Sequence, residues 1–313
     1  MKPGAVWKGY VKRVFLGGVL LGTGIFVALL FLPPVGAPEN YYSLEQAARS
    51  PRSVQKLVLR QQGLTRVPDG VRQLTNLRYI NLFGNNISKL PSWLISNPRV
   101  AEVSLENNRL TVFPPELTDM TNLRTLRLDY NNIAELPASV GKLIGLEVLS
   151  LNENRLKALP AEIGQLGALS HLGVGGNRLE TLPVEIGQLS NLEGLSVAGN
   201  MLSDLPVEIG NLARLKGLNL ENNRLTDLPK EMSQLVALEK LWLDGNRLSP
   251  KAQETIQRLL PHTHIDFGHQ VDGADRENRR TGKSKSTPGV TADLPSSVGW
   301  SGGIARYGPP FAR

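Results

Sequence analysis

The sequence predicts an α/β solenoid: a horseshoe of stacked coils with a concave parallel β-sheet and short helical or 3₁₀ segments on its convex side. Three observations predict it, namely an apolar pattern that recurs every 23 residues, an asparagine at one position in eight of the nine repeats and a proline at another position in eight of them. Counted from Val54, nine repeats follow one another to Leu248 without insertion or deletion. Because each unit can bury its apolar side only against its neighbours, the stack should share one continuous core.

The apolar positions predict one strand per repeat. Offsets 0, 3, 5 and 10 from the first residue hold leucine, isoleucine or valine in every repeat. Alternation at offsets 3 and 5 is typical of a strand with one buried side, so Leu172 and Val174 should point inward and Gly173 outward. Nine strands about 4.8 Å apart form a sheet about 40 Å along its arc, which is large enough for a protein partner.

The polar position at offset 8 is predicted to be structural. A buried asparagine both donates and accepts hydrogen bonds, so a stack of asparagines can satisfy the backbone groups of the turns. The first repeat has Gln62 there, and the others have Asn85, Asn108, Asn131, Asn154, Asn177, Asn200, Asn223 and Asn246.

The proline at offset 14 should fix the backbone where the chain turns onto the convex side. The ninth repeat has Ala252 instead, because the cap begins there. The first eight repeats have Pro68, Pro91, Pro114, Pro137, Pro160, Pro183, Pro206 and Pro229.

The full pattern, LxxLxLxxNxLxxLPxxIGxLxx, is clearest in residues 169–191 and 192–214 and resembles the 23-residue leucine-rich-repeat family. The resemblance covers about two thirds of the chain. Its LPxxIGxL half is similar to repeats of the cytosolic Ras-group and bacterial types, and unlike the disulfide-capped animal receptors. The resemblance implies a protein-binding scaffold without catalysis, but it implies no particular partner, because one scaffold serves many functions.

Atypical units are expected at both ends of residues 54–248, since an open stack exposes its core there. Residues 43–53 are predicted to form the N-terminal cap, with a short helix from Ser43 to Ser50. Residues 249–267 are predicted to form the C-terminal cap, with a helix starting at Pro250 and a last strand within residues 263–267. The residues expected to face the repeats are Leu44, Ala47 and Ala48 in the first cap and Ile256, Leu259 and Leu260 in the second.

Residues 14–32 are predicted to be a transmembrane signal anchor. The 19 residues carry no charge, and as a helix they would span about 28 Å, close to the hydrocarbon thickness of a bilayer. The basic segment 1–13 places the N-terminus in the cytoplasm and the repeats outside, after a linker at 33–42. In the alternative, the segment is cleaved after Ala37 and the protein is secreted or periplasmic, although Pro38 and the long apolar run favour retention.

Two further features concern the ends of the chain. Gly18 and Gly22 have the small-xxx-small spacing that would permit a weak dimer through the membrane helix. Residues 268–313 are rich in Gly, Ser, Pro and Arg and are predicted to be a disordered tail. The formal charge of +7 is concentrated in the two terminal segments, so the repeats form no basic stripe and nucleic-acid binding is not expected.

No catalytic or metal-binding constellation is predicted. The chain has no cysteine, which excludes disulfides, thiolate zinc sites and a thiol nucleophile. His262, His264 and His269 follow the repeats without a third ligand placed by the repeat geometry, so neither a metal nor a cofactor is expected. Residues 173–176 are glycine-rich but lie in a strand and an asparagine turn, whereas a phosphate-binding loop would open a helix.

Specificity should lie at offsets 2, 4, 6 and 7, which face the concave side and take no part in the core. Repeats 2 to 4 mix aromatic residues with both charge signs, as centres of interfaces do, and repeats 5 to 8 present small residues that would admit an extended chain. The alternative is that these positions are merely solvated and that a partner binds elsewhere. The candidate partner-binding residues are Tyr79, Asn81, Phe83, Glu102, Glu106, Arg127, Asp129, Tyr130, His171, Trp242 and Asp244.

The sequence therefore predicts a membrane-anchored, non-catalytic scaffold that binds an unknown protein or peptide. An alternative function is an envelope structural or adhesion protein that contacts polysaccharide or another cell.

Overall fold

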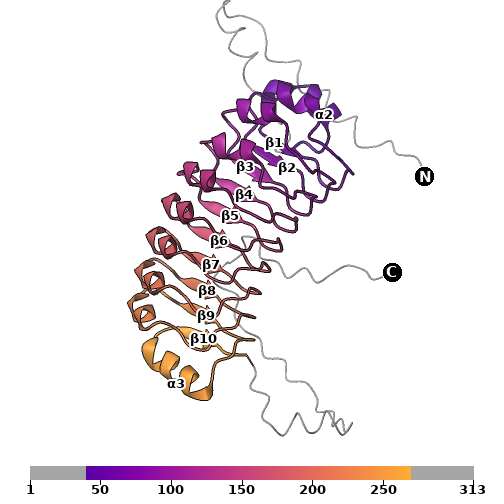
Figure 1. Ribbon diagram of the computed structural model, residues 1–313. Helices are drawn as coiled ribbons and strands as arrows, with labels where there is room; N and C mark the ends of the chain where they lie inside the picture. Colours follow the sequence, from indigo (N-terminus) through magenta and orange to yellow (C-terminus); the bar gives the residue numbers. More distant parts are fainter. Residues whose placement is uncertain (1–39, 269–313) are drawn as a thin grey trace, which may run out of the picture. The chain divides into compact units, whose positions relative to one another are not determined.

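The structure is a computed structural model and describes residues 40–268. Ten strands form one parallel sheet in sequence order along one side of the stacked coils (Figure 1). The tenth strand comes from the C-terminal cap. The strands are β1 (Lys56–Val58), β2 (Tyr79–Asn81), β3 (Glu102–Ser104), β4 (Thr125–Arg127), β5 (Val148–Ser150), β6 (His171–Gly173), β7 (Gly194–Ser196), β8 (Gly217–Asn219), β9 (Lys240–Trp242) and β10 (His264–Asp266).

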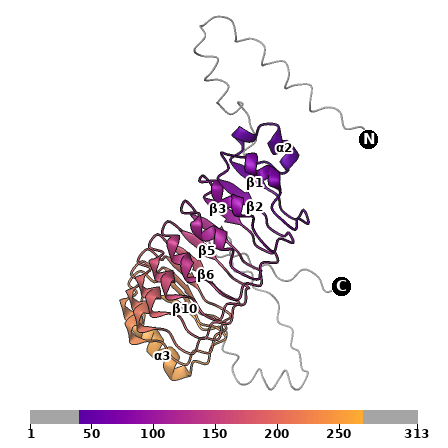
Figure 2. The same ribbon diagram turned by 45° about the horizontal axis from the view of Figure 1, so that its top comes forward.

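The opposite side of the coils carries short 3₁₀ helices (Figure 2). Each helix from η2 to η9 begins directly after the recurring proline, whose backbone is extended. This arrangement confirms the predicted solenoid with its helical convex side. The helices are η1 (Pro51–Ser53), η2 (Asp69–Gln73), η3 (Ser92–Ser96), η4 (Pro115–Asp119), η5 (Ala138–Lys142), η6 (Ala161–Gln165), η7 (Val184–Gln188), η8 (Val207–Asn211) and η9 (Lys230–Gln234).

The sheet keeps the register of the sequence repeat. Leu57 pairs with Ile80 and Leu172 with Leu195, each 23 residues further along the chain. The apolar residues at offsets 0, 3 and 5 are buried throughout. At offset 10 only Leu64 and Leu248 are partly exposed, because they lie in the first and last repeats and lack a neighbouring coil on one side.

The asparagine at offset 8 is structural, as predicted. The Asn177 side-chain nitrogen donates to the carbonyl oxygens of Leu151 (2.9 Å) and Val174 (2.9 Å), and its oxygen accepts from the Leu156 N–H (2.9 Å). The pattern recurs from Asn85 to Asn246, so adjacent asparagines share carbonyl acceptors and connect neighbouring coils. Across the described residues, every buried polar side-chain atom has a hydrogen-bond partner.

The residue at offset 7, just before this asparagine, has a left-handed backbone in every repeat. Its φ is 54° at Tyr130 and 63° at Gly176, for example. Left-handed backbone favours glycine and tolerates asparagine, which explains why these residue types recur at this position. Tyr130 and Glu153 adopt it at a steric cost, and Tyr130 has 49% of its surface exposed.

The N-terminal end of the stack is covered by helix α2 (Leu44–Ala48), in which the Ser43 hydroxyl oxygen accepts from the Gln46 N–H at 3.1 Å. Ala47 is fully buried and Leu44 packs against the core, but the prediction for Ala48 was wrong, because Ala48 is exposed. The helix ends at Ala48 rather than continuing to Ser50, and Leu44 and Ala47, three residues apart, share the side that faces the core.

The cap begins before this helix. Tyr41, predicted to belong to a linker, is buried and forms a parallel bridge with Leu57. It extends the sheet by one bridge and covers the outer edge of β1.

The C-terminal end is covered by helix α3 (Pro250–Leu259) and by β10. The Ser249 hydroxyl oxygen accepts from the Ala252 N–H at 3.1 Å, with Pro250 at the first helical position. Ile256 and Leu260 are buried against the last coil, and β10 pairs with β9.

Within residues 40–268, no helix is both long and apolar enough to cross a membrane. The predicted span at 14–32, with Gly18 and Gly22, lies outside the described residues, as does the tail from residue 269 onward.

Candidate functional site

The predicted partner-binding residues all lie on the concave face, and each is at least partly accessible. Tyr79 and Asn81 on β2, Glu102 on β3 and Arg127 on β4 are brought side by side by the parallel register. Phe83, Glu106, Asp129 and Tyr130 follow directly after these strands. His171 on β6 stands apart from this group, and Trp242 and Asp244 lie at the C-terminal end of the sheet. The structure therefore brings together one group on β2 to β4 and leaves three predicted residues separate from it.

The aromatic residues of this group are held in place. The Asn81 side-chain nitrogen donates to the Tyr79 hydroxyl oxygen (2.7 Å), and the Asn81 oxygen accepts from the Phe83 N–H (3.0 Å). The Arg60 guanidinium lies 4.8 Å from the centre of the Phe83 ring, a cation–π distance. A partner would therefore meet ordered aromatic side chains and would lose little conformational entropy in ordering them.

The surroundings of the Glu106 carboxyl group disfavour its charged form. Burial raises its pKa and the negative charge of Asp129 raises it further, whereas the hydrogen bond from the Ser104 hydroxyl and the charge of Arg127 lower it. The net pKa shift is upward, so the surrounding protein destabilises the charged form of this half-buried carboxyl. A cation supplied by a partner would favour that charged form.

Asp129 is oriented by two residues that the sequence did not single out, Ser150 and Asn152. Its Oδ1 accepts from the Ser150 hydroxyl (2.6 Å), the Asn152 N–H (2.9 Å) and the Asn152 side-chain nitrogen (2.6 Å). The Asn152 oxygen in turn accepts from the Gly175 N–H (2.8 Å). Their positions at offsets 4 and 6 of the fifth repeat were sufficient to mark Ser150 and Asn152 as concave residues.

Gly173 makes room for this network. A Cβ at Gly173 would lie 2.8 Å from the Asn152 side-chain nitrogen, closer than real contacts allow. The Asn152 side-chain amide lies over Gly173 and Gly175, which partly explains why the sixth repeat has small residues there.

Tyr130 presents its ring beside these carboxylates. Burial raises the pKa of its hydroxyl, and the charges of Glu153 and Asp129 raise it further. The ring therefore stays neutral at physiological pH and adjoins two negative charges.

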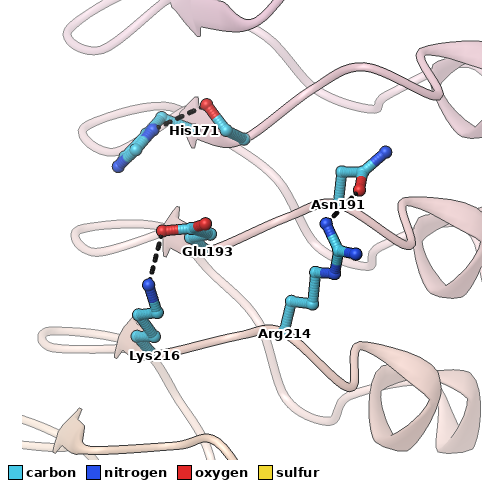
Figure 3. Close-up of polar contacts among 6 residues, drawn as sticks. His171, Asn191, Glu193, Arg214 and Lys216 are labelled. Atoms are coloured by element: carbon cyan, nitrogen blue, oxygen red, sulfur yellow. Dashed lines mark hydrogen bonds and ion pairs between the residues drawn. The ribbon is translucent and has the colours of Figure 1, made fainter.

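At the edge of the sheet where the strands begin, charged side chains are paired between neighbouring coils (Figure 3). Across neighbouring coils, Lys216 Nζ pairs with the Glu193 carboxylate at 2.8 Å, and Arg214 donates to the Asn191 side-chain oxygen at 2.7 Å. The hydrogen bond from Lys216 lowers the pKa of Glu193, as do the charges of Lys216, His171 and Arg214. His171 Nδ1 lies 2.9 Å from the Ser170 hydroxyl. Opposite charges therefore alternate along this edge and largely compensate one another.

Two further features of residues 40–268 concern metal binding and cavities. Within residues 40–268, no group of three or more His, Asp or Glu side chains is arranged to hold a metal ion. A hollow of about 290 Å³ lies between η2 and η3, where the Arg72 guanidinium is 5.7 Å from the Trp93 ring centre. Its other lining residues are Val71, Thr75, Leu94, Asn97 and Pro98, which include no carboxylate, imidazole or amine.

Two family models match the repeats. One, described as a leucine-rich repeat region, matches residues 99–201, and the other, described as a leucine rich repeat, matches residues 52–117 and 190–248. A search of curated proteins found no match.

Solved structures with the same fold include a leucine-rich-repeat protein of Leptospira interrogans. It is 43% identical, with a TM-score of 0.68, over 69% of this chain and 55% of that one. The ectodomain of the membrane receptor kinase GASSHO1/SCHENGEN3 from Arabidopsis thaliana, in complex with Casparian strip integrity factor 2, is 31% identical with a TM-score of 0.56 over 63% of this chain and 24% of that one. The plant peptide hormone receptor RGFR1, in complex with RGF2, is 28% identical with a TM-score of 0.59 over 68% of this chain and 36% of that one. The chain thus spans about half of the first structure and less of the two receptors.

Proposed function

Because the chain belongs to the leucine-rich-repeat family, we propose that it is a non-catalytic scaffold that binds a protein or peptide partner through its concave face. The observation that carries this proposal is the ordered group on β2 to β4, where aromatic rings and carboxylates lie side by side and accessible. Aromatic anchors in a polar surround are typical of the energetically important part of a protein interface. The repeat pattern supports assignment of the chain to the 23-residue LPxxIGxL type.

The comparisons support a polypeptide partner at the level of the fold. Two of the similar structures are plant receptors, each in complex with a ligand, and one of those receptors is described as a peptide hormone receptor. Both share the coil architecture over more than half of this chain.

The proposal is tested by replacing two aromatic side chains. In the variant Phe83→Ala plus Tyr130→Ala, capture of the native partner from its own host, identified by crosslinking to the wild-type protein, should fall by at least about tenfold, since anchors of this kind contribute 2 kcal/mol or more. The control is Val112→Ala plus Ile144→Ala, which shortens two exposed apolar side chains outside the concave positions. Equal capture by both variants would show that the partner does not bind at β2 to β4.

We further propose that residues 14–32 tether the scaffold to a membrane with the repeats on the extracytoplasmic side. The support is an uncharged run of 19 residues preceded by Lys8, Lys12 and Arg13. Full-length protein should remain in the membrane fraction after alkaline carbonate washing, and protein lacking residues 1–37 should not. A shortened, soluble mature form in the host would instead support the cleaved alternative.

A further inference from the structure

The concave face has a charge opposite to that of the whole chain. The formal net charge of the chain is +7. At offsets 2, 4, 6 and 7 of the nine repeats, however, six carboxylates stand against four cations (Lys56, Arg60, Arg127 and Lys240). At offsets 4, 6 and 7 of the third to ninth repeats, the only cation is Arg127. The carboxylates at those positions, called here the acidic rim, are Glu106, Asp129, Glu153, Glu221 and Asp244. The acidic rim therefore lies just after the C-terminal ends of the strands. At the opposite edge of the sheet, where the strands begin, acidic and basic side chains instead form ion pairs between neighbouring coils.

The acidic rim is interrupted by a floor of small residues in the sixth to eighth repeats. The residues at offset 2 of successive coils pair with one another across the sheet and form a row. In this row two glycines, Gly194 and Gly217, lie between the exposed side chains of His171 and Lys240. In the next row Gly173 pairs with Ser196. The trough is defined as Gly194, Ser196, Ala198 and Gly217, because the Asn152 side chain covers Gly173 and Gly175 of the sixth repeat.

Ser196 is the one residue of the trough that offers an unused hydrogen-bonding group. It is 9% exposed, and its hydroxyl forms no hydrogen bond with any residue of the described part of the chain. The serines at the same offset elsewhere differ, since Ser104 donates to Glu106 and Ser150 to Asp129. The Ser196 oxygen lies 3.5 Å from where a Cβ on Gly175 would stand, so it lies on the concave side, at the edge of the trough. Because no fully buried side-chain oxygen or nitrogen of the described residues lacks a partner, the Ser196 oxygen keeps access to solvent, and a ligand can form a hydrogen bond with it.

We propose that the trough seats the main chain of an extended peptide that carries lysine or arginine side chains, which pair with the acidic rim on both sides of it. This inference rests on the proposed function and names its partner class. Absence of side chains lets a peptide backbone approach the sheet closely, and the Ser196 hydroxyl bonds to one of its peptide groups. The carboxylates favour a cationic ligand and disfavour anionic polymers.

The dimensions set a spacing for the ligand. Glu153 and Glu221 lie in coils three repeats apart, and at about 4.8 Å per strand this amounts to about 14 Å. An extended peptide advances about 3.3 Å per residue, so basic side chains about four residues apart reach both halves of the rim.

The test uses a displayed library of random peptides, selected on the full-length protein in detergent micelles. Peptides retained by the wild type should be enriched in lysine and arginine about four residues apart. In Gly194→Val plus Gly217→Val, valine fills the trough, and the fold already accepts valine at the equivalent position Val148. Affinity of the selected peptides, measured by fluorescence anisotropy, should fall at least about tenfold in this variant.

Two further variants separate the contributions. Ser196→Ala should weaken binding several-fold, and Glu221→Gln plus Asp244→Asn should weaken it and reduce its dependence on salt. The control is Gly167→Val, since a Cβ there meets no atom within 4 Å. Selection of neutral or acidic peptides, or undiminished binding to the valine variant with an unchanged melting midpoint, would overturn the inference.

These outcomes are distinguishable from failure of the proposed function. If capture of the native partner depends on Phe83 and Tyr130 while the library yields no basic peptides, the concave scaffold stands and the trough proposal is wrong. If neither aromatic nor trough variants affect any partner, both proposals are wrong.

Discussion

Replacing Asn177 by alanine is expected to lower the free energy of unfolding by about 2 to 3 kcal/mol. This loss of stability arises because the substitution leaves one hydrogen-bond partner of Asn177 unsatisfied, while its other partners keep a second hydrogen bond. The carbonyls of Leu151 and Val174 keep a second donor, because Asn154 and Asn200 also bond to them. The buried Leu156 N–H has its acceptor in Asn177 and would be left without it.

The measurement is urea unfolding followed by far-ultraviolet circular dichroism. Asn211→Ala serves as the matched control, because Asn211 is an exposed residue at the end of η8, and it should change stability by less than about 0.5 kcal/mol. If Asn177→Ala were as mild as Asn211→Ala, the asparagine stack would not be a main source of cohesion between coils.

Introducing aspartate at Ile256 is expected to cost about 4 kcal/mol or more and to cause association. Ile256 is 1% exposed and lies on the side of α3 that covers the last coil. A charge there would displace the cap and expose apolar residues of the ninth repeat such as Leu243, which is 2% exposed. Uncovered ends of open solenoids present apolar surface and unpaired strands to other molecules.

Size-exclusion chromatography coupled to light scattering would show this change as a shift from the wild-type mass to large, polydisperse species. Gln257→Asp introduces the same charge at the neighbouring exposed position of α3 and should elute like the wild type. A well-folded Ile256→Asp protein of wild-type mass would contradict the assigned role of the cap.

The fold could be predicted from the sequence because each structural requirement is repeated. A single leucine at one position is ambiguous, but leucine, isoleucine or valine at the same offsets in nine units indicates one strand and one turn per unit. The ends were harder to predict, since each cap occurs once and has no internal comparison. The wrong orientation of Ala48 and the pairing of Tyr41 with β1 both belong to such an end.

The candidate site was predictable in position but not in detail. Offsets identified which residues face the concave side, whereas the contacts depend on which side chain occupies the same offset one coil away. Asp129 is fixed by Ser150 and Asn152 of the next coil, and the Ser196 hydroxyl lacks such a partner. The raised pKa of Glu106 likewise arises from burial and from Asp129 on the adjacent coil. These properties are set by pairs of residues that the single-repeat pattern does not contain.

Because the 23-residue register is constant, distances along the sheet are fixed in whole strand spacings. Each coil adds one strand spacing of about 4.8 Å, so the separation of any two surface groups changes only in whole steps when repeats are gained or lost. Duplication of one internal repeat would lengthen the distance between the two halves of the acidic rim by one step while every coil kept its own hydrogen bonds. A lineage can thus alter the length of ligand it accommodates without redesigning its core, and an engineer can do the same by inserting a copy of residues 192–214.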